Sequence, residues 1–138
     1  MLYIKSFDSI RIITCPNLWH IIENTEIKSS ATACSVALTR DGELIAHAYQ
    51  HSGLTHSRTL LPMIEALCDA AATPLSAVDL LAVSVGPGSF TGIRIGVATV
   101  KAMCFAFNKP CLSVTSFDTL AYNIDGKVLA VIDAKHNG

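Results

Sequence analysis

The chain has 138 residues, of which 51% are hydrophobic and 15% charged, and its mean hydropathy is +0.45. A chain of this length and composition folds as one compact domain with an ample core, which excludes disorder over most of its length. Its 10 basic and 11 acidic residues leave a net charge of −1. The chain therefore lacks the cationic surface that direct binding of nucleic acid requires.

The N-terminus and the apolar segments predict where the protein is located. Met1–Cys15 lacks the basic start, apolar middle and small-residue cleavage site of a signal peptide. Gly, Thr, Lys or Pro interrupts each long apolar run before the roughly 18 residues that cross a bilayer. We expect a cytoplasmic protein without a membrane span. The 5 cysteines form no C-x-x-C pair, which favours reduced, mostly buried thiols.

The clearest local pattern is a β-hairpin. Two β-prone runs, Cys34–Arg40 and Glu43–Tyr49, flank Asp41-Gly42, a pair typical of tight primed turns. A further strand is expected before the hairpin. Two segments qualify for it, Leu18–Glu23 and the more polar stretch around Thr25–Ile27, and the sequence does not decide between them.

Helical spacing of apolar residues begins after Thr55 and predicts an amphipathic helix that ends before Thr73-Pro74. The nearly continuous apolar run Val78–Val85 is typical of a buried parallel strand. A second, more apolar helix is expected over Ile93–Phe107, with Asn108 and Pro110 ending it.

Three shorter elements complete the chain. We expect a strand over Cys111–Val114, a helix over Ser116–Tyr122 capped by Ser116, and a strand over Lys127–Ile132. The order of all these elements predicts an α/β fold, in which a mixed sheet with a β-hairpin is flanked by helices.

The loop between the buried strand and the apolar helix is the main candidate site. It consists of Gly86, Pro87, Gly88, Ser89, Phe90, Thr91, Gly92 and Arg94. The loop lacks the Gly-Lys-Ser/Thr end of a Walker A motif, and its glycine spacing differs from the dinucleotide-binding fingerprint. Two interpretations remain: a helix N-terminus, capped by Ser89 or Thr91, that receives an anion beside Arg94, or a structural turn.

No catalytic or metal-binding pattern is present elsewhere in the sequence. A G-x-S-x-G nucleophile elbow is absent, and His47 and His51 are too far apart along a strand to share one ion. We predict no catalytic residue and no metal site.

The second helix carries only Arg94 and Lys101 as charges. A sheet covers one side of a helix, so an apolar helix of this kind needs a partner chain or a second lobe on another side. The small residues of Gly92-x-x-x-Gly96 allow close packing, most simply against the sheet. If Val100 faces the partner, Val100→Arg abolishes pairing and leaves the fold intact.

Three segments together resemble the bacterial TsaB (YeaZ) family: Ala33–Leu38, Thr55–Ile64 and Val85–Thr99, the last containing G-P-G-S-F-T-G-x-R. The resemblance extends from about Ile27 to Asn137. It implies an actin-like (ribonuclease H-like) fold in two lobes. It also implies a role in making threonylcarbamoyladenosine in tRNAs that decode ANN codons, as a non-catalytic partner of TsaD.

The resemblance further implies partners and an interface. The chain is expected to form a homodimer when alone, to pair with a TsaD-like subunit, and to work beside a TsaE-like ATPase. The expected interface residues, all on the two long helices, are Leu60, Met63, Ile64, Leu67, Ile93, Gly96, Val97, Val100, Met103 and Cys104. The metal-binding motif of the catalytic paralogue falls on Thr115–Leu120, which keeps no histidine. We expect no cofactor, and a nucleotide only at a partner interface.

The resemblance divides the chain into three parts. We expect residues 1–26 to be a divergent extension or a replacement first strand, residues 27–126 to be the first lobe, and residues 127–138 to be the start of a missing second lobe. The acidic residue of the family's first strand falls on Lys28, or on Glu23 if residues are inserted, which weakens metal-phosphate chemistry. The alternatives to a partner protein are an actin-like ATPase, a glycoprotease-like enzyme, or a truncated inactive fragment.

Overall fold

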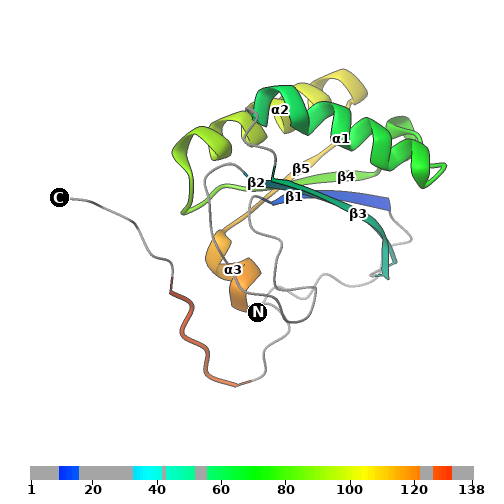
Figure 1. The fold of residues 1–138 in the computed structure, drawn as a ribbon. Coiled ribbons are helices and arrows are strands. Elements are labelled where there is room, and N and C mark those ends of the chain that lie inside the picture. The colour runs from blue at the N-terminus through cyan, green and yellow to red at the C-terminus, as the bar shows by residue number, and fades with distance from the viewer. Residues whose placement is uncertain (1–9, 16–32, 42, 52–55, 122–125, 132–138) are drawn as a thin grey trace.

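The computed structural model describes residues 10–15, 33–41, 43–51, 56–121 and 126–131. One mixed sheet of five strands has the order β3-β2-β1-β4-β5. Its strands are β1 (Ile10–Cys15), β2 (Ala33–Arg40), β3 (Glu43–His51), β4 (Leu80–Ser84) and β5 (Cys111–Val114). Helices α1 (His56–Ala70) and α2 (Phe90–Phe107) lie on one face of the sheet and the short α3 (Ser116–Ala121) on the other (Figure 1). The predicted α/β fold with a hairpin and flanking helices is confirmed.

The hairpin forms as predicted. Strands β2 and β3 pair antiparallel from Ala33 opposite His51 to Arg40 opposite Glu43, with one irregularity between Leu38 and Thr39. Asp41 in the turn has a φ of 54°, the left-handed conformation that primed turns require.

The strand before the hairpin is neither of the two segments expected from the sequence. It is β1, which pairs antiparallel with β2 and parallel with β4 and so occupies the centre of the sheet. Leu18–Glu23 and Thr25–Ile27 lie outside the described residues. Strand β1 reads IRIITC, and its β-branched residues suit a central strand better than either alternative. It lies within residues 1–26.

The core lies between the sheet and the two long helices. Val36 and Leu38 of β2 and Leu81 and Val83 of β4 face the helices. The buried helix residues that meet them are Leu60, Ile64, Leu67, Cys68, Val100 and Met103. Because these recur every three or four residues, each helix turns one apolar stripe toward the sheet. Burying each such side chain contributes about 1.5–3 kcal/mol.

The ends of α2 follow the sequence closely. The helix begins at Phe90, earlier than predicted, because the Ser89 side chain caps it by accepting a hydrogen bond from the Gly92 N–H at 3.3 Å. It ends at Phe107, and its C-cap Asn108 has a left-handed φ of 50° and donates its N–H to the Cys104 carbonyl.

The cap of α3 is Thr115, so the prediction of Ser116 as the cap was wrong. The Asp118 N–H donates to Thr115 Oγ1 at 3.1 Å, and the Thr115 N–H donates to Asp118 Oδ2 at 3.3 Å. This reciprocal pair is a capping box. Ser116 is instead buried, and its Oγ lies 3.2 Å from Ser84 Oγ, so its hydroxyl ties α3 to the sheet.

The strand expected over Lys127–Ile132 is absent from its described part, residues 127–131. Leu129 and Val131 are 87% and 74% exposed there. A strand needs a neighbour to satisfy its N–H and C=O groups, and no described strand lies beside this segment. Its apolar composition alone is not enough to make it a strand.

Among the described residues, α2 is the one helix long and apolar enough to cross a membrane by length and composition. Core helices of globular domains meet the same criterion, and α2 packs on β4 and β5. The absence of a membrane span therefore stays a prediction.

Candidate functional site

The glycine loop joins β4 to α2 and is fastened at both ends. The Val85 N–H donates to the Val114 carbonyl, and the Ser116 N–H donates to the Gly86 carbonyl, both at 2.9 Å. On the helix side, the Ile93 N–H donates to the Ser89 carbonyl at 2.9 Å. The loop thus connects β4, β5, α2 and α3.

Gly86 is required by both its backbone and its surroundings. Its φ is +96°, and a Cβ at this position would lie 2.7 Å from Ile93 Cδ1. A Cβ at Gly88 would meet the same Ile93 atom at 3.8 Å. An added Cβ at Gly88 would thus fit, whereas Gly86 makes room for a side chain of the protein itself. This favours the structural-turn interpretation of the loop over the anion-binding one.

Replacing Gly86 by alanine is expected to destabilise the fold by about 2 kcal/mol, because a left-handed φ costs ~1 kcal/mol and Ile93 must leave its rotamer. Gly126→Ala is the matched control, since Gly126 has a φ of +98° and nothing within 4 Å of the added Cβ. Thermal unfolding of both variants gives the comparison. Adding Ile93→Ala to Gly86→Ala should recover part of the loss, and equal stabilities of the two glycine variants would contradict this account.

Most of the remaining loop residues are exposed. Pro87, Gly88 and Thr91 are exposed, and Phe90 is 73% exposed. The Arg94 guanidinium carbon lies 5.2 Å from the centre of the Phe90 ring, a cation–π contact that holds this arginine on the helix surface. Gly92 is half-buried.

The predicted partner interface does not form one exposed surface. Leu60, Ile64, Leu67, Val100 and Met103 are 0–6% exposed. They are buried because the sheet and the neighbouring long helix together cover them, and this part of the interface prediction is corrected. A partner reaches these side chains only if the domain opens.

The other predicted interface residues are half-buried: Met63, Ile93, Gly96, Val97 and Cys104. Met63, Val97 and Cys104 pack against the core. A Cβ at Gly96 would lie at an ordinary 3.7 Å from Val83 Cγ2 of β4, so Gly96 faces the sheet. The small residue serves packing within the chain.

Of the outward side of α2, the sequence predicted only Phe90 and Arg94, as part of the glycine loop, and the rest was missed. Some of its exposed residues recur at intervals of three or four, with Lys101 and Ala102 adjacent, and form a stripe. We call this stripe the α2 outer face: Phe90, Arg94, Ala98, Lys101, Ala102 and Phe105. Phe105 is 91% exposed, the highest value among the large hydrophobic residues described. Both charged residues of this helix lie on the stripe. The sequence could therefore have indicated the exposed face through the residues one helical turn from each charge.

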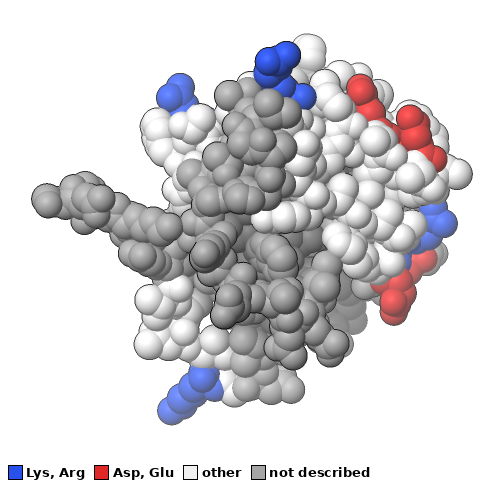
Figure 2. Space-filling view, viewed as in Figure 1, with Lys and Arg blue, Asp and Glu red and all other residues white. Residues whose placement is uncertain are grey.

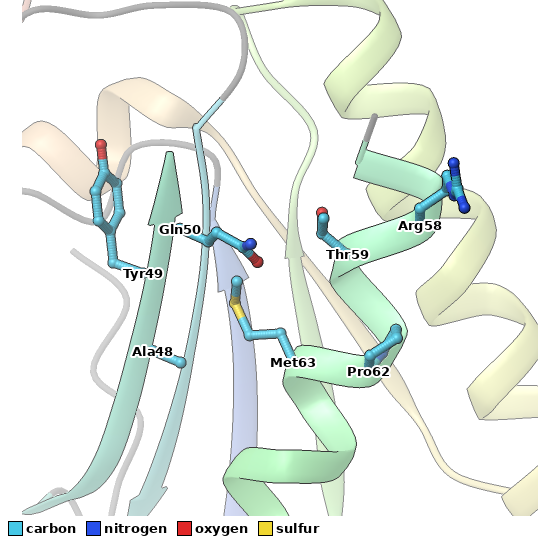
Figure 3. A pocket seen from close by; sticks show the side chains of 7 residues that line it. All are labelled: Ala48, Tyr49, Gln50, Arg58, Thr59, Pro62 and Met63. Carbon is cyan, nitrogen blue, oxygen red and sulfur yellow. The ribbon is translucent and has the colours of Figure 1, made fainter. Parts of the chain in front are cut away.

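A shallow open hollow of about 500 Å³ lies between β3 and the first turns of α1. Its lining residues are Ala48, Tyr49, Gln50, Arg58, Thr59, Pro62 and Met63. Gln50 and Thr59 turn toward the hollow, whereas Arg58 points away from it (Figure 3). The Thr59 hydroxyl contacts Cys34 Sγ at 3.7 Å. Without converging charged groups, the hollow has no chemistry of an active site.

Among the described residues, no group of three or more His, Cys, Asp or Glu side chains is placed to hold a metal ion. The segment Thr115–Leu120, on which the resemblance places the metal-binding motif of the catalytic paralogue, forms the cap and most of α3. Its one carboxylate, on Asp118, accepts hydrogen bonds from the Thr115 N–H and hydroxyl within the cap. The described site therefore offers packing and surface contacts rather than reactive groups.

Comparison with known proteins identifies the family of this chain. A family model described as TsaD, tRNA N6-adenosine threonylcarbamoyltransferase, matches residues 50–138. The tRNA threonylcarbamoyladenosine biosynthesis proteins TsaB of Escherichia coli and Bacillus subtilis are 35% and 34% identical to this chain. Each match covers 79% of this chain and 49% of the relative.

A solved structure, YeaZ from Pseudomonas aeruginosa, superposes with a TM-score of 0.65 at 35% identity, over 82% of this chain and 46% of that one. This chain therefore spans about half the length of these relatives. The fold is the actin-like (ribonuclease H-like) α/β fold expected from the resemblance. By the family model and these relatives, the chain belongs to the TsaD family and, within it, to the TsaB (YeaZ) group.

Proposed function

We propose that this chain is a non-catalytic, TsaB-like partner of a TsaD-like subunit in the synthesis of threonylcarbamoyladenosine in tRNA. Relatives at 34–35% identity carry the name tRNA threonylcarbamoyladenosine biosynthesis protein TsaB. The observation that carries the proposal is the α2 outer face, which leaves two aromatic side chains in water. Phe90 and Phe105 are 73% and 91% exposed.

The α2 outer face has the composition of a protein interface. Aromatic residues and arginine are enriched at such interfaces, and a few of them supply most of the binding energy. Between the two phenylalanines, the small side chains of Ala98 and Ala102 allow a neighbouring helix to approach closely. We assign this face to the TsaD-like subunit in the complex and to a second copy of the chain when that subunit is absent.

A non-catalytic role agrees with the chemistry of the described residues. The resemblance places the paralogue's metal motif on Thr115–Leu120, and the one carboxylate there, on Asp118, is engaged in a helix cap. The surface of the described residues is largely uncharged on the face in Figure 2, with Lys and Arg side chains standing apart from one another. Such a surface suits a protein partner, and contact with the tRNA is assigned to other subunits.

Several parts of the proposal remain predictions. These are the cytoplasmic location, the contact with a TsaE-like ATPase, and a nucleotide held at a partner interface. No observation on the described residues favours an actin-like ATPase or a glycoprotease-like enzyme.

Light scattering on size-exclusion fractions tests the proposal with the full chain, alone and mixed with a TsaD-like subunit. We expect a homodimer that converts to a one-to-one complex. The mixture should also support threonylcarbamoyladenosine formation when the remaining pathway proteins and tRNA are added. A chain that ignores the TsaD-like subunit at micromolar concentration, or that hydrolyses ATP alone, would overturn the proposal.

A further inference from the structure

The end of α2 and the start of β5 bring two cysteines together. Cys104 lies in the last turn of α2, and Cys111 is the first residue of β5. The left-handed Asn108 reverses the chain between them. As a result, the Cys104 thiol donates a hydrogen bond to the Pro110 carbonyl at 3.8 Å, immediately before Cys111. Cys111 is also among the neighbours that raise the pKa of the Cys104 thiol, which agrees with the two side chains lying next to each other.

Both cysteines are held by the surrounding backbone. The Asn108 N–H and the Lys109 N–H, the latter at 2.9 Å, donate to the Cys104 carbonyl. The Leu81 N–H donates to the Pro110 carbonyl at 3.1 Å, and Cys111 pairs with Leu81 in the parallel ladder of β4 and β5. The closeness of the two thiols is therefore a property of the fold, beyond what their spacing in sequence provides.

The two thiols differ in their access to solvent. Cys111 is exposed and Cys104 is half-buried, whereas Cys34 and Cys68 are buried. Burial and, second, the neighbouring Cys111 raise the pKa of the Cys104 thiol, so this group stays protonated at neutral pH. Because Cys111 is the exposed thiol and so meets the oxidant, it is the first to react.

We propose that Cys104 and Cys111 are a thiol oxidation site and form a reversible intramolecular disulfide. With hydrogen peroxide as oxidant, the Cys111 sulfur attacks one peroxide oxygen, the O–O bond breaks, and a sulfenic acid and water form. The Cys104 sulfur then attacks the sulfenic sulfur, losing its proton. The S–O bond breaks, a second water leaves, and both sulfurs have been oxidised while the peroxide has been reduced.

The test uses the full folded chain in glutathione buffers of defined ratio, followed by alkylation, trypsin digestion and mass spectrometry. The tryptic peptide 102–127 contains Cys104 and Cys111 and no other cysteine, because the Lys109-Pro110 bond resists trypsin. We expect this peptide to lose two hydrogens and to escape alkylation. In the folded chain the change should occur in a buffer about tenfold more reducing than the same synthetic peptide needs.

Single-cysteine variants assign the chemistry. In Cys104→Ser, peroxide should leave a sulfenic acid on Cys111 that dimedone traps, because the resolving thiol is missing. Cys68→Ser is the matched control and should form the disulfide as the unaltered chain does. The proposal is overturned if the folded chain oxidises no more readily than the peptide, or if both thiols still accept the alkylating reagent after peroxide treatment.

Discussion

Val100→Arg is expected to unfold the domain rather than to detach a partner. Val100 is 1% exposed and lies in the core between α2 and the sheet. An arginine there buries an unpaired charge, which costs on the order of 3–5 kcal/mol, in addition to overpacking a filled site. Because domains of this size are stable by only about 5–15 kcal/mol, most of the stability is lost.

Circular dichroism during thermal unfolding measures this effect, and Ala98→Arg is the matched control. Ala98 lies on the same helix but is exposed, so the same new side chain reaches water there. Its expected change in the free energy of unfolding is within about 0.5 kcal/mol. If Val100→Arg unfolds at the same temperature as the unaltered chain, the burial of Val100 described here is wrong.

The residues Val100 and Ala98 also show what the sequence determines for α2 and what it does not. Composition and spacing predicted an apolar helix after the glycine loop, and the helix is there. Which side of α2 is buried depends on α1. The contact between α1 and α2 joins segments that are distant in sequence, so the sequence of α2 alone does not reveal it. Since the sheet and α1 together bury Val100 and Met103, side chains expected in an interface belong to the core.

The two ends of the described chain show the same limit for strands. Ile10–Cys15 and the apolar stretch after Gly126 have similar β-prone compositions. The first becomes the central strand because β2 and β4 flank it, whereas the described part of the second has no neighbouring strand. Pairing between segments that are distant in sequence decides whether each stretch becomes a strand. The periodicity of residues within one segment carries no information about that pairing.

The glycine loop was found from its sequence, but its role required the structure. Three glycines in a short segment indicate unusual backbone or close approach, whatever approaches them. The structure identifies Ile93 Cδ1 as the atom that Gly86 accommodates. A contact within the chain and a bound anion require the same pattern of glycines. The sequence therefore did not distinguish between the two interpretations.

Phe105→Glu is expected to weaken binding of the TsaD-like subunit by about 100-fold while the domain stays folded. Phe105 is 91% exposed on the α2 outer face, so its replacement removes no core packing. At an interface, loss of a buried aromatic side chain commonly costs ≥ ~2 kcal/mol, and a desolvated carboxylate adds to the cost. Isothermal titration calorimetry with the full chain measures the change.

Phe117→Glu provides the matched control, because Phe117 is also an exposed aromatic residue, at 42%, but lies on α3 across the sheet from α2. Its binding affinity should stay within about twofold of the unaltered chain, since rim and remote positions contribute little. The opposite pattern, with Phe117→Glu weakening binding and Phe105→Glu not, moves the interface to the α3 side of the sheet. In that case the exposure of α2 has another cause, and the assignment of the α2 outer face to a TsaD-like partner fails even if the chain still forms a complex.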